Sequence, residues 1–170
     1  NAMDPQERQR QAVLDLIAEW DETPPQHPII LAGSTGSRGT TLLLMEAIAK
    51  LPQGAVVLPG FDEDQPDHVW QTLSDALSSE DHPQYRFFKL MQDLEMGPRD
   101  VRRWTDANPA STPRNRLVSL ALRPAPVTDA WMRQGPQLRD IDSATSEITL
   151  VEAPGPRAEA LATALRLRQA

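Results

Sequence analysis

The pattern of apolar and polar positions predicts an α/β fold that contains a βαβ unit. Short apolar runs at 29–31 and 56–58 have the length and composition of strands that are buried on both faces. Between them, residues 40–50 place apolar side chains on one helical face: Leu43, Leu44, Ala47 and Ile48. Because parallel strands need such a crossover, the sequence predicts a parallel sheet with this helix packed on it.

Helices are expected on both sides of this unit, and prolines mark where they start. Asp4 and Pro5 form a helix start, and apolar positions at helical spacing follow until the prolines at 24 and 25. Between residues 65 and 123, prolines stand near the helix starts, where a missing amide does no harm. The remaining expected elements are helices at 67–77, 84–95, 98–104, 113–122 and 127–133, a strand at 148–151 and a helix at 158–169.

These elements divide the chain into four segments. Residues 1–3 read as an expression-tag remnant. Residues 4–62 hold the first helix and the βαβ unit, 63–140 form a helical insertion, and 141–170 begin a second βα element. Because the last helix has no glycine, proline or polar stop after it, we expect the chain to be a piece of a larger protein.

Composition narrows the chemistry. The 170 residues include no cysteine, which excludes disulfides, thiolate zinc sites and iron–sulfur clusters within this sequence. No transmembrane span or signal peptide is visible, so a cytoplasmic location is expected. The formal charge of −7 argues against binding nucleic acid through net charge alone. Arginines nevertheless concentrate between residues 99 and 123, where a local basic face is possible.

The glycine-rich turn after the first strand is the main candidate for a binding site, because α/β proteins hold phosphates at such turns. A Walker A loop would need a lysine, and the sixth residue counted from Gly33 is Arg38, so ATP binding is not expected here. Gly33, Gly36 and Gly39 also match the dinucleotide turn of a small NAD(P)-binding oxidoreductase.

Further residues fit this alternative only in part. Asp62 stands where a carboxylate could hold a ribose, and Tyr85 with Lys89 forms the YxxxK pair of short-chain dehydrogenases. Too few residues separate the glycine turn from Tyr85 for the βα units of that fold. The plainer interpretation is that the glycines serve a close strand-to-helix turn.

No metal site is expected from the sequence. The histidines His27, His68 and His82 are scattered, and none pairs with another at ligand spacing. The acidic stretch 62–67 lacks the central glycine and the closing glutamate of a calcium loop.

Several blocks in order carry a resemblance to a known family: AGSTGSRGTT, LPQGAVVLPGFD, EDHPQYRF, LVSLALRPAPVTDAW and ITLVEAPGPRAEALATALRLR. From 27 to 169 the chain resembles an internal segment of the AddB family. These are the B subunits of bacterial AddAB helicase–nucleases, which repair DNA double-strand breaks, and the likeness is to the alphaproteobacterial type.

The resemblance implies a degenerate P-loop NTPase-like, helicase-like core with a helical insertion, and a non-catalytic role in DNA handling and subunit assembly. It implies an AddA-type helicase–nuclease subunit as partner, DNA contact through the full complex, and no membrane. ATP, magnesium and the iron–sulfur cluster would belong to other parts of the parent protein, and no cofactor, metal or catalytic residue is assigned to this segment. A stand-alone interaction domain is the third hypothesis.

The candidates for contact with DNA or phosphate are arginines. Four lie in the middle of the chain, and the fifth opens the last helix, where the helix dipole disfavours a cation and a phosphate or carboxylate contact is conceivable. They are Arg102, Arg103, Arg114, Arg116 and Arg157.

Overall fold

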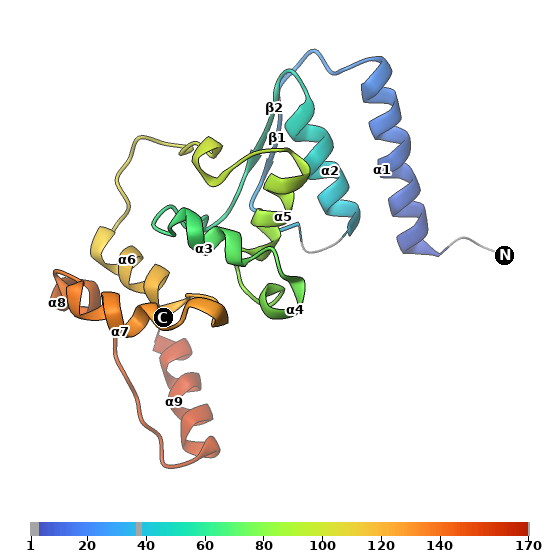
Figure 1. Cartoon of the computed structure of the whole chain (residues 1–170). Coiled ribbons are helices and arrows are strands. Elements are labelled where there is room, and N and C mark those ends of the chain that lie inside the picture. Colours follow the sequence, from blue (N-terminus) through green and yellow to red (C-terminus); the bar gives the residue numbers. More distant parts are fainter. Residues whose placement is uncertain (1–3, 37–38, 170) are drawn as a thin grey trace.

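The chain is mixed α/β and mostly helical (Figure 1). The computed structural model describes residues 4–36 and 39–169. The first part comprises α1 (Pro5–Glu22), β1 (Ile29–Ala32), α2 (Gly39–Lys50) and β2 (Gly54–Val57). The helical part comprises α3 (Asp67–Thr72), α4 (Ala76–Ser79), α5 (Tyr85–Asp93), α6 (Thr112–Ala121), α7 (Ala130–Gln134), α8 (Ile141–Thr145) and α9 (Pro156–Gln169), with single 3-10 turns at Pro98–Asp100, Ala125–Val127 and Gly135–Gln137.

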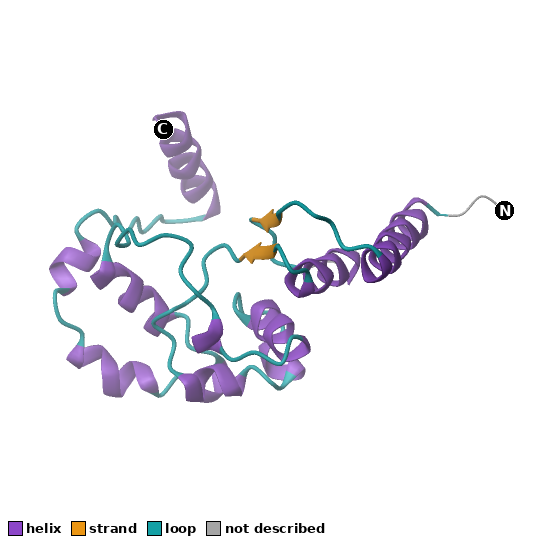
Figure 2. Cartoon of the chain, turned by 90° about the horizontal axis from the view of Figure 1, so that it is seen from above, coloured by secondary structure: helices purple, strands orange, loops and turns teal. Residues whose placement is uncertain are grey.

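The predicted βαβ unit is confirmed. Strands β1 and β2 pair in parallel, with Ile29 opposite Gly54 and Ala32 opposite Val57. Helix α2 packs against both strands, and α1 packs against α2 (Figures 1 and 2). The apolar runs and the helical spacing between them therefore identified the first part of the fold.

The more specific expectation of a P-loop helicase-like core is not met by this sheet. Within residues 4–36 and 39–169 the sheet has two strands, whereas a P-loop core is built on a larger parallel sheet. Along β1 half-buried and exposed residues alternate, and Ile30 keeps 54% of its surface exposed. Parallel sheets are normally covered on both faces, so one face here lacks the cover that such a core provides.

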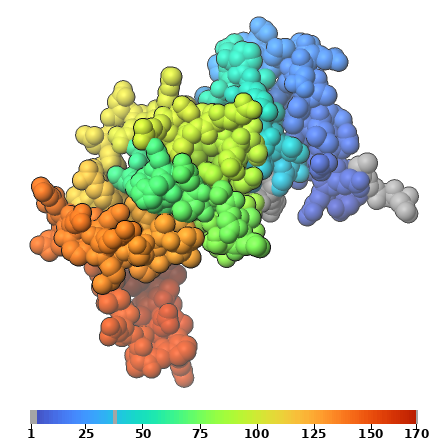
Figure 3. Space-filling model, in the orientation of Figure 1, coloured from blue at the N-terminus to red at the C-terminus, as the bar shows by residue number. Residues whose placement is uncertain are grey.

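The predicted strand at 148–151 is wrong. This segment has no regular structure, and Ile148, Leu150 and Val151 are exposed. An apolar run becomes a strand only where a neighbouring strand completes its hydrogen bonds, and no described strand pairs with it. The 141–170 segment therefore holds α8 and α9 rather than a βα unit. Figure 3 shows α9, in red, projecting from the rest of the molecule.

Several predicted helices are shorter than expected, including the one at 127–133, where the α-helix is Ala130–Gln134. The helix predicted at 67–77 breaks into α3 and α4, because the Asp75 carboxylate accepts a hydrogen bond from the Leu77 amide and starts a new helix. The helix predicted at 98–104 is a single 3-10 turn. There the Asp100 carboxylate accepts from the Gly97 amide, and the chain then runs on as an exposed loop.

Most of the best-buried side chains belong to the helical part, and Met45 of α2 is buried to the same degree. Trp70, Leu73 and Met91 form the centre of this core, and Phe61 stacks on Trp70 with ring centroids 5.0 Å apart. Phe61 follows β2, so this stack ties the βαβ unit to the helices. No helix in the described ranges 4–36 and 39–169 combines the length and apolarity needed to cross a membrane.

Gly54 is required by close packing at the start of β2. A Cβ atom built on it would lie 1.7 Å from the carbonyl oxygen of Ile48, at the end of α2. Because that oxygen belongs to the backbone, it cannot move aside as a flexible side chain would. Only glycine lets the chain turn this tightly from α2 into β2.

We therefore expect Gly54→Ala to destabilise the protein by about 2 kcal/mol or more, through displacement of backbone at the α2–β2 turn. Gly135→Ala is the control, since a Cβ there meets nothing within 4 Å. Urea unfolding monitored by circular dichroism measures both variants. Equal stabilities of the two would contradict the packing argument.

Candidate functional site

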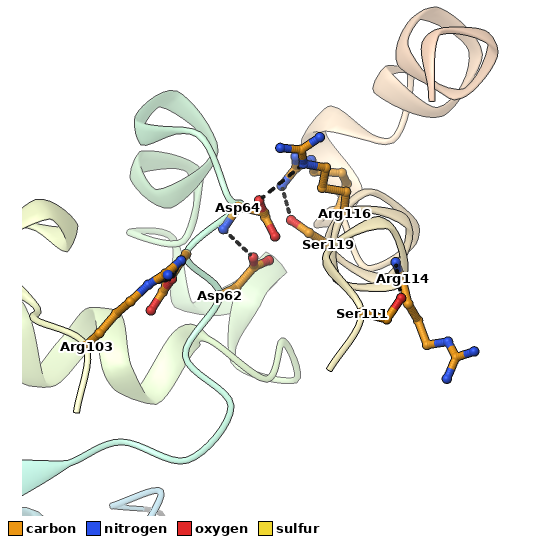
Figure 4. Close-up of polar contacts among 9 residues, drawn as sticks. Asp62, Asp64, Arg103, Ser111, Arg114, Arg116 and Ser119 are labelled. Carbon is orange, nitrogen blue, oxygen red and sulfur yellow. Dashed lines mark hydrogen bonds and ion pairs between the residues drawn. The ribbon is translucent and has the colours of Figure 1, made fainter. Parts of the chain in front are cut away.

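A cleft of about 700 Å³ lies between the loop that follows β2 and the segments around α6. Four segments form its walls: the loop 60–64 after β2, the turn 82–84 before α5, the loop 103–109, and α6. Figure 4 shows the polar residues that meet there. These segments are distant in sequence, so only the fold brings them together.

Three of the five predicted arginines line this cleft. Arg103 comes from the loop before α6, and Arg114 and Arg116 come from α6. Arg102 is exposed next to Arg103 but does not line the cleft, and Arg157 is exposed at the start of α9. The fold therefore gathers part of the predicted set and leaves two members elsewhere.

Each of the three arginines in the cleft has a partner. Both Nε and Nη2 of Arg103 contact Oε2 of Glu63, at 2.6 and 2.5 Å. Arg116 Nε lies 3.9 Å from Oδ1 of Asp64, and Arg114 Nε donates to the carbonyl oxygen of Ala144 at 3.0 Å. In Figure 4 the acidic loop lies between Arg103 on one side and Arg116 on the other, while Arg114 extends away from it.

The buried amide of Gln84 fixes the acidic loop in place. Its Oε1 accepts from the Asp62 amide at 3.1 Å, and its Nε2 donates to the Gly60 carbonyl at 2.9 Å. The Asp62 carboxylate in turn accepts from the Asp64 amide at 3.0 Å, which closes an Asx turn. The loop is thereby held in the conformation that presents its carboxylates to the arginines.

His82 joins two walls of the cleft. Its Nδ1 accepts from the Gln84 amide at 3.2 Å, so Nε2 carries the proton and donates to the carbonyl oxygen of Leu122 at 2.6 Å. Leu122 caps the C-terminal end of α6, where carbonyl groups lack helical partners. The turn before α5 is thus fastened to the end of α6.

Arg123 was not among the candidate residues, and its guanidinium bonds to Ser119, which lines the cleft. It is 7% exposed, its Nη1 donates to Ser119 Oγ at 3.3 Å, and its Nε has no hydrogen-bond partner among the described residues. Burial lowers the pKa of its guanidinium, and the negative charges of Asp62 and Asp64 oppose that shift. In the sequence, Arg123 stands out only as one of the arginines concentrated between residues 99 and 123. That position does not reveal that its side chain is buried.

The glycine turn has structural reasons for its glycines. Gly33 and Gly36 have φ values of +79° and +65°, a region that side chains disfavour. A Cβ on Gly36 would also lie 3.1 Å from the sulfur of Met45 in α2. Arg38, which enters the comparison with a Walker loop, lies outside the described residues. These contacts agree with the interpretation of a close strand-to-helix turn.

The other residues of the oxidoreductase alternative also have places in the fold. Tyr85 is 8% exposed, with the Arg86 guanidinium 5.6 Å from its ring centroid. Lys89 donates to the side chain of Gln92, and Asp62 lines the arginine cleft. None of these contacts assembles a dinucleotide site.

Within the described part of the chain, no group of three or more histidine, aspartate or glutamate side chains is placed to hold a metal ion. Comparisons with models of protein families, with curated proteins and with solved structures found no match to this chain.

The Gln84 clamp is testable by substitution. We expect Gln84→Ala to destabilise the protein by about 2 kcal/mol, because two hydrogen bonds are lost and the Asp62 amide is left in a half-buried position. Gln137→Ala removes an exposed bond to the Arg133 carbonyl and is the control, with an expected loss below about 0.5 kcal/mol. Chemical unfolding gives both values, and a Gln84→Ala loss as small as the control's would refute the clamp.

Asp64 makes stability depend on pH. Burial raises the pKa of its carboxyl, Asp62 adds to the rise, and Arg116 opposes it. The contribution of Asp64 to the free energy of unfolding is therefore fully present below the pKa of this carboxyl in the unfolded chain, about 4. It is lost as the pH rises through the higher pKa of the same carboxyl in the folded protein.

We expect the melting temperature of Asp64→Asn, relative to the unsubstituted protein, to increase as the pH is raised from about 4 to about 6. Asp142→Asn on the exposed surface of α8 is the control. Differential scanning fluorimetry across this range gives the result. A difference that falls with rising pH would mean that the pKa of Asp64 is lowered instead.

Proposed function

We propose that this chain is a non-catalytic segment of an AddB-type subunit of a helicase–nuclease for double-strand break repair. In this role it handles DNA and contributes to assembly with an AddA-type subunit. The resemblance of several sequence blocks, found in order, supports the assignment. The fold supports it only as far as the mixed α/β class, since its two-stranded sheet is not a P-loop helicase core. ATP, magnesium and the iron–sulfur cluster would act in other parts of the parent enzyme.

One observation carries the DNA-handling part of the proposal: the fold gathers Arg103, Arg114 and Arg116 in one cleft. Guanidinium groups bind phosphate oxygens through paired hydrogen bonds, and several of them along one groove can follow a nucleic-acid backbone. Trp104 lines the same cleft and keeps 67% of its surface exposed, so its indole is available for stacking on a base. The overall charge of −7 makes such binding local and sensitive to salt.

The assembly part of the proposal is supported by apolar side chains that this chain does not bury. They lie on β1, on the segment before α9, and on α9 itself, and contact with other protein surfaces would cover them. These residues are Ile30, Ile148, Leu150, Val151, Leu161, Leu165 and Leu167.

We expect the protein to bind a fluorescein-labelled 20-nucleotide single strand weakly at about 25 mM salt, with affinity falling steeply towards about 150 mM. The triple variant Arg103→Gln/Arg114→Gln/Arg116→Gln should bind about tenfold more weakly, because it loses phosphate contacts and leaves the cleft acidic. Fluorescence anisotropy measures both.

The control has the same loss of charge elsewhere. Arg139→Gln/Arg166→Gln/Arg168→Gln removes three exposed arginines outside the cleft. Equal weakening by the two triple variants would mean that only net charge matters. No binding at low salt, either by the unsubstituted protein or after neutralisation of the acidic loop 62–64, would reject a direct role in DNA handling.

A further inference from the structure

The carboxylates of the acidic loop 62–64 pair with guanidinium groups that a nucleic-acid backbone would contact. Glu63 Oε2 contacts both Nε and Nη2 of Arg103, and Asp64 Oδ1 forms a longer ion pair with Nε of Arg116, at 3.9 Å. A carboxylate presents two oxygens to a guanidinium much as a phosphate does. In the cleft as described, the arginines on its two sides are therefore already neutralised by the chain itself.

We propose that the loop Asp62–Asp64 is an autoinhibitory element, which holds Arg103 and Arg116 until a phosphate backbone displaces it. This inference rests on the proposed DNA-handling function and concerns the regulation of the same cleft. On this proposal the acidic loop competes with phosphate for the arginines, rather than being an ordinary solvated surface loop.

The loop is built to stay in place. Gln84 holds its backbone at Gly60 and Asp62, and the Asx turn fixes Asp64 relative to Asp62. The positive charge of the buried Arg123 also attracts both aspartates. Because these contacts are intramolecular, the carboxylates face the arginines at a high effective concentration.

The loop is also built to be displaced. The Arg103–Glu63 side chains remain 55% and 44% exposed, and those of Arg116 and Asp64 remain 64% and 34% exposed. Exposed pairs of this kind are individually weak, so a polyanion with several phosphates competes with them effectively. Arg114 has no carboxylate partner in the described structure and offers a first contact.

The experiment neutralises the loop and measures affinity for the labelled 20-nucleotide strand. Glu63→Gln/Asp64→Asn should tighten binding about three- to tenfold at low salt, since each released pair contributes a factor of a few. The control, Glu147→Gln/Glu152→Gln, removes two exposed carboxylates outside the cleft. It should change affinity by less than about twofold, through net charge alone.

A second comparison isolates Arg103. In the unsubstituted protein Arg103→Gln should weaken binding only about twofold, because a phosphate must first displace Glu63 from the Arg103 guanidinium. In the Glu63→Gln/Asp64→Asn background the same substitution should remove much of the gain. This non-additivity is the signature of competition for one group.

The outcomes separate the two proposals. If the unsubstituted protein binds the strand but both double variants tighten it equally, or if Arg103→Gln acts alike in both backgrounds, the autoinhibitory role is wrong and the DNA-handling function stands. If neither the unsubstituted protein nor the Glu63→Gln/Asp64→Asn variant binds, the DNA-handling function itself fails.

Discussion

The arrangement of the cleft depends on one buried amide. Gln84 stands before α5 and hydrogen-bonds the backbone on both sides of Phe61, at Gly60 and Asp62. Phe61 stacks on Trp70 in the helical core. The loop after β2 is thus anchored by packing and by hydrogen bonds at adjacent residues. This double attachment joins the small sheet to the helices and determines the position of the acidic loop, residues 62–64.

The electrostatics of the cleft follow from that placement. Three carboxylates, on Asp62, Glu63 and Asp64, face arginines from α6 and from the preceding loop. The pKa of the Asp64 carboxyl is raised by burial and by the charge of Asp62, and Arg116 opposes that rise. The facing arginine thus offsets part of the repulsion among the carboxylates. A chain with net charge −7 thereby holds a cluster of arginines without an overall basic surface.

The sequence allowed prediction of those parts that depend on local pattern. The parallel pair, its crossover helix and the proline-started α6 follow from spacing within short windows. The concentration of arginines in the middle of the chain was also visible. The segment 148–151 was mispredicted because an apolar run has strand character, whereas strand formation depends on a partner that local pattern does not reveal. The cleft, the Gln84 clamp and the burial of Arg123 arise from contacts between distant segments, so no local pattern could identify them.

The distribution of buried residues bears on how this fold would work. A two-stranded parallel sheet covered mainly by α2 buries little, and neither α1 nor α9 contains a buried residue among those described. Well-buried side chains lie in α2, at Met45 and Ile48, and around Trp70 in the helical part. Exposed apolar side chains lie on β1 and α9, and also in the cleft itself, at Trp104, Val118 and Leu122. β1 and α9 contribute no residue to the lining of the cleft, so a contact that covers their apolar side chains would leave the three arginines of the cleft in place.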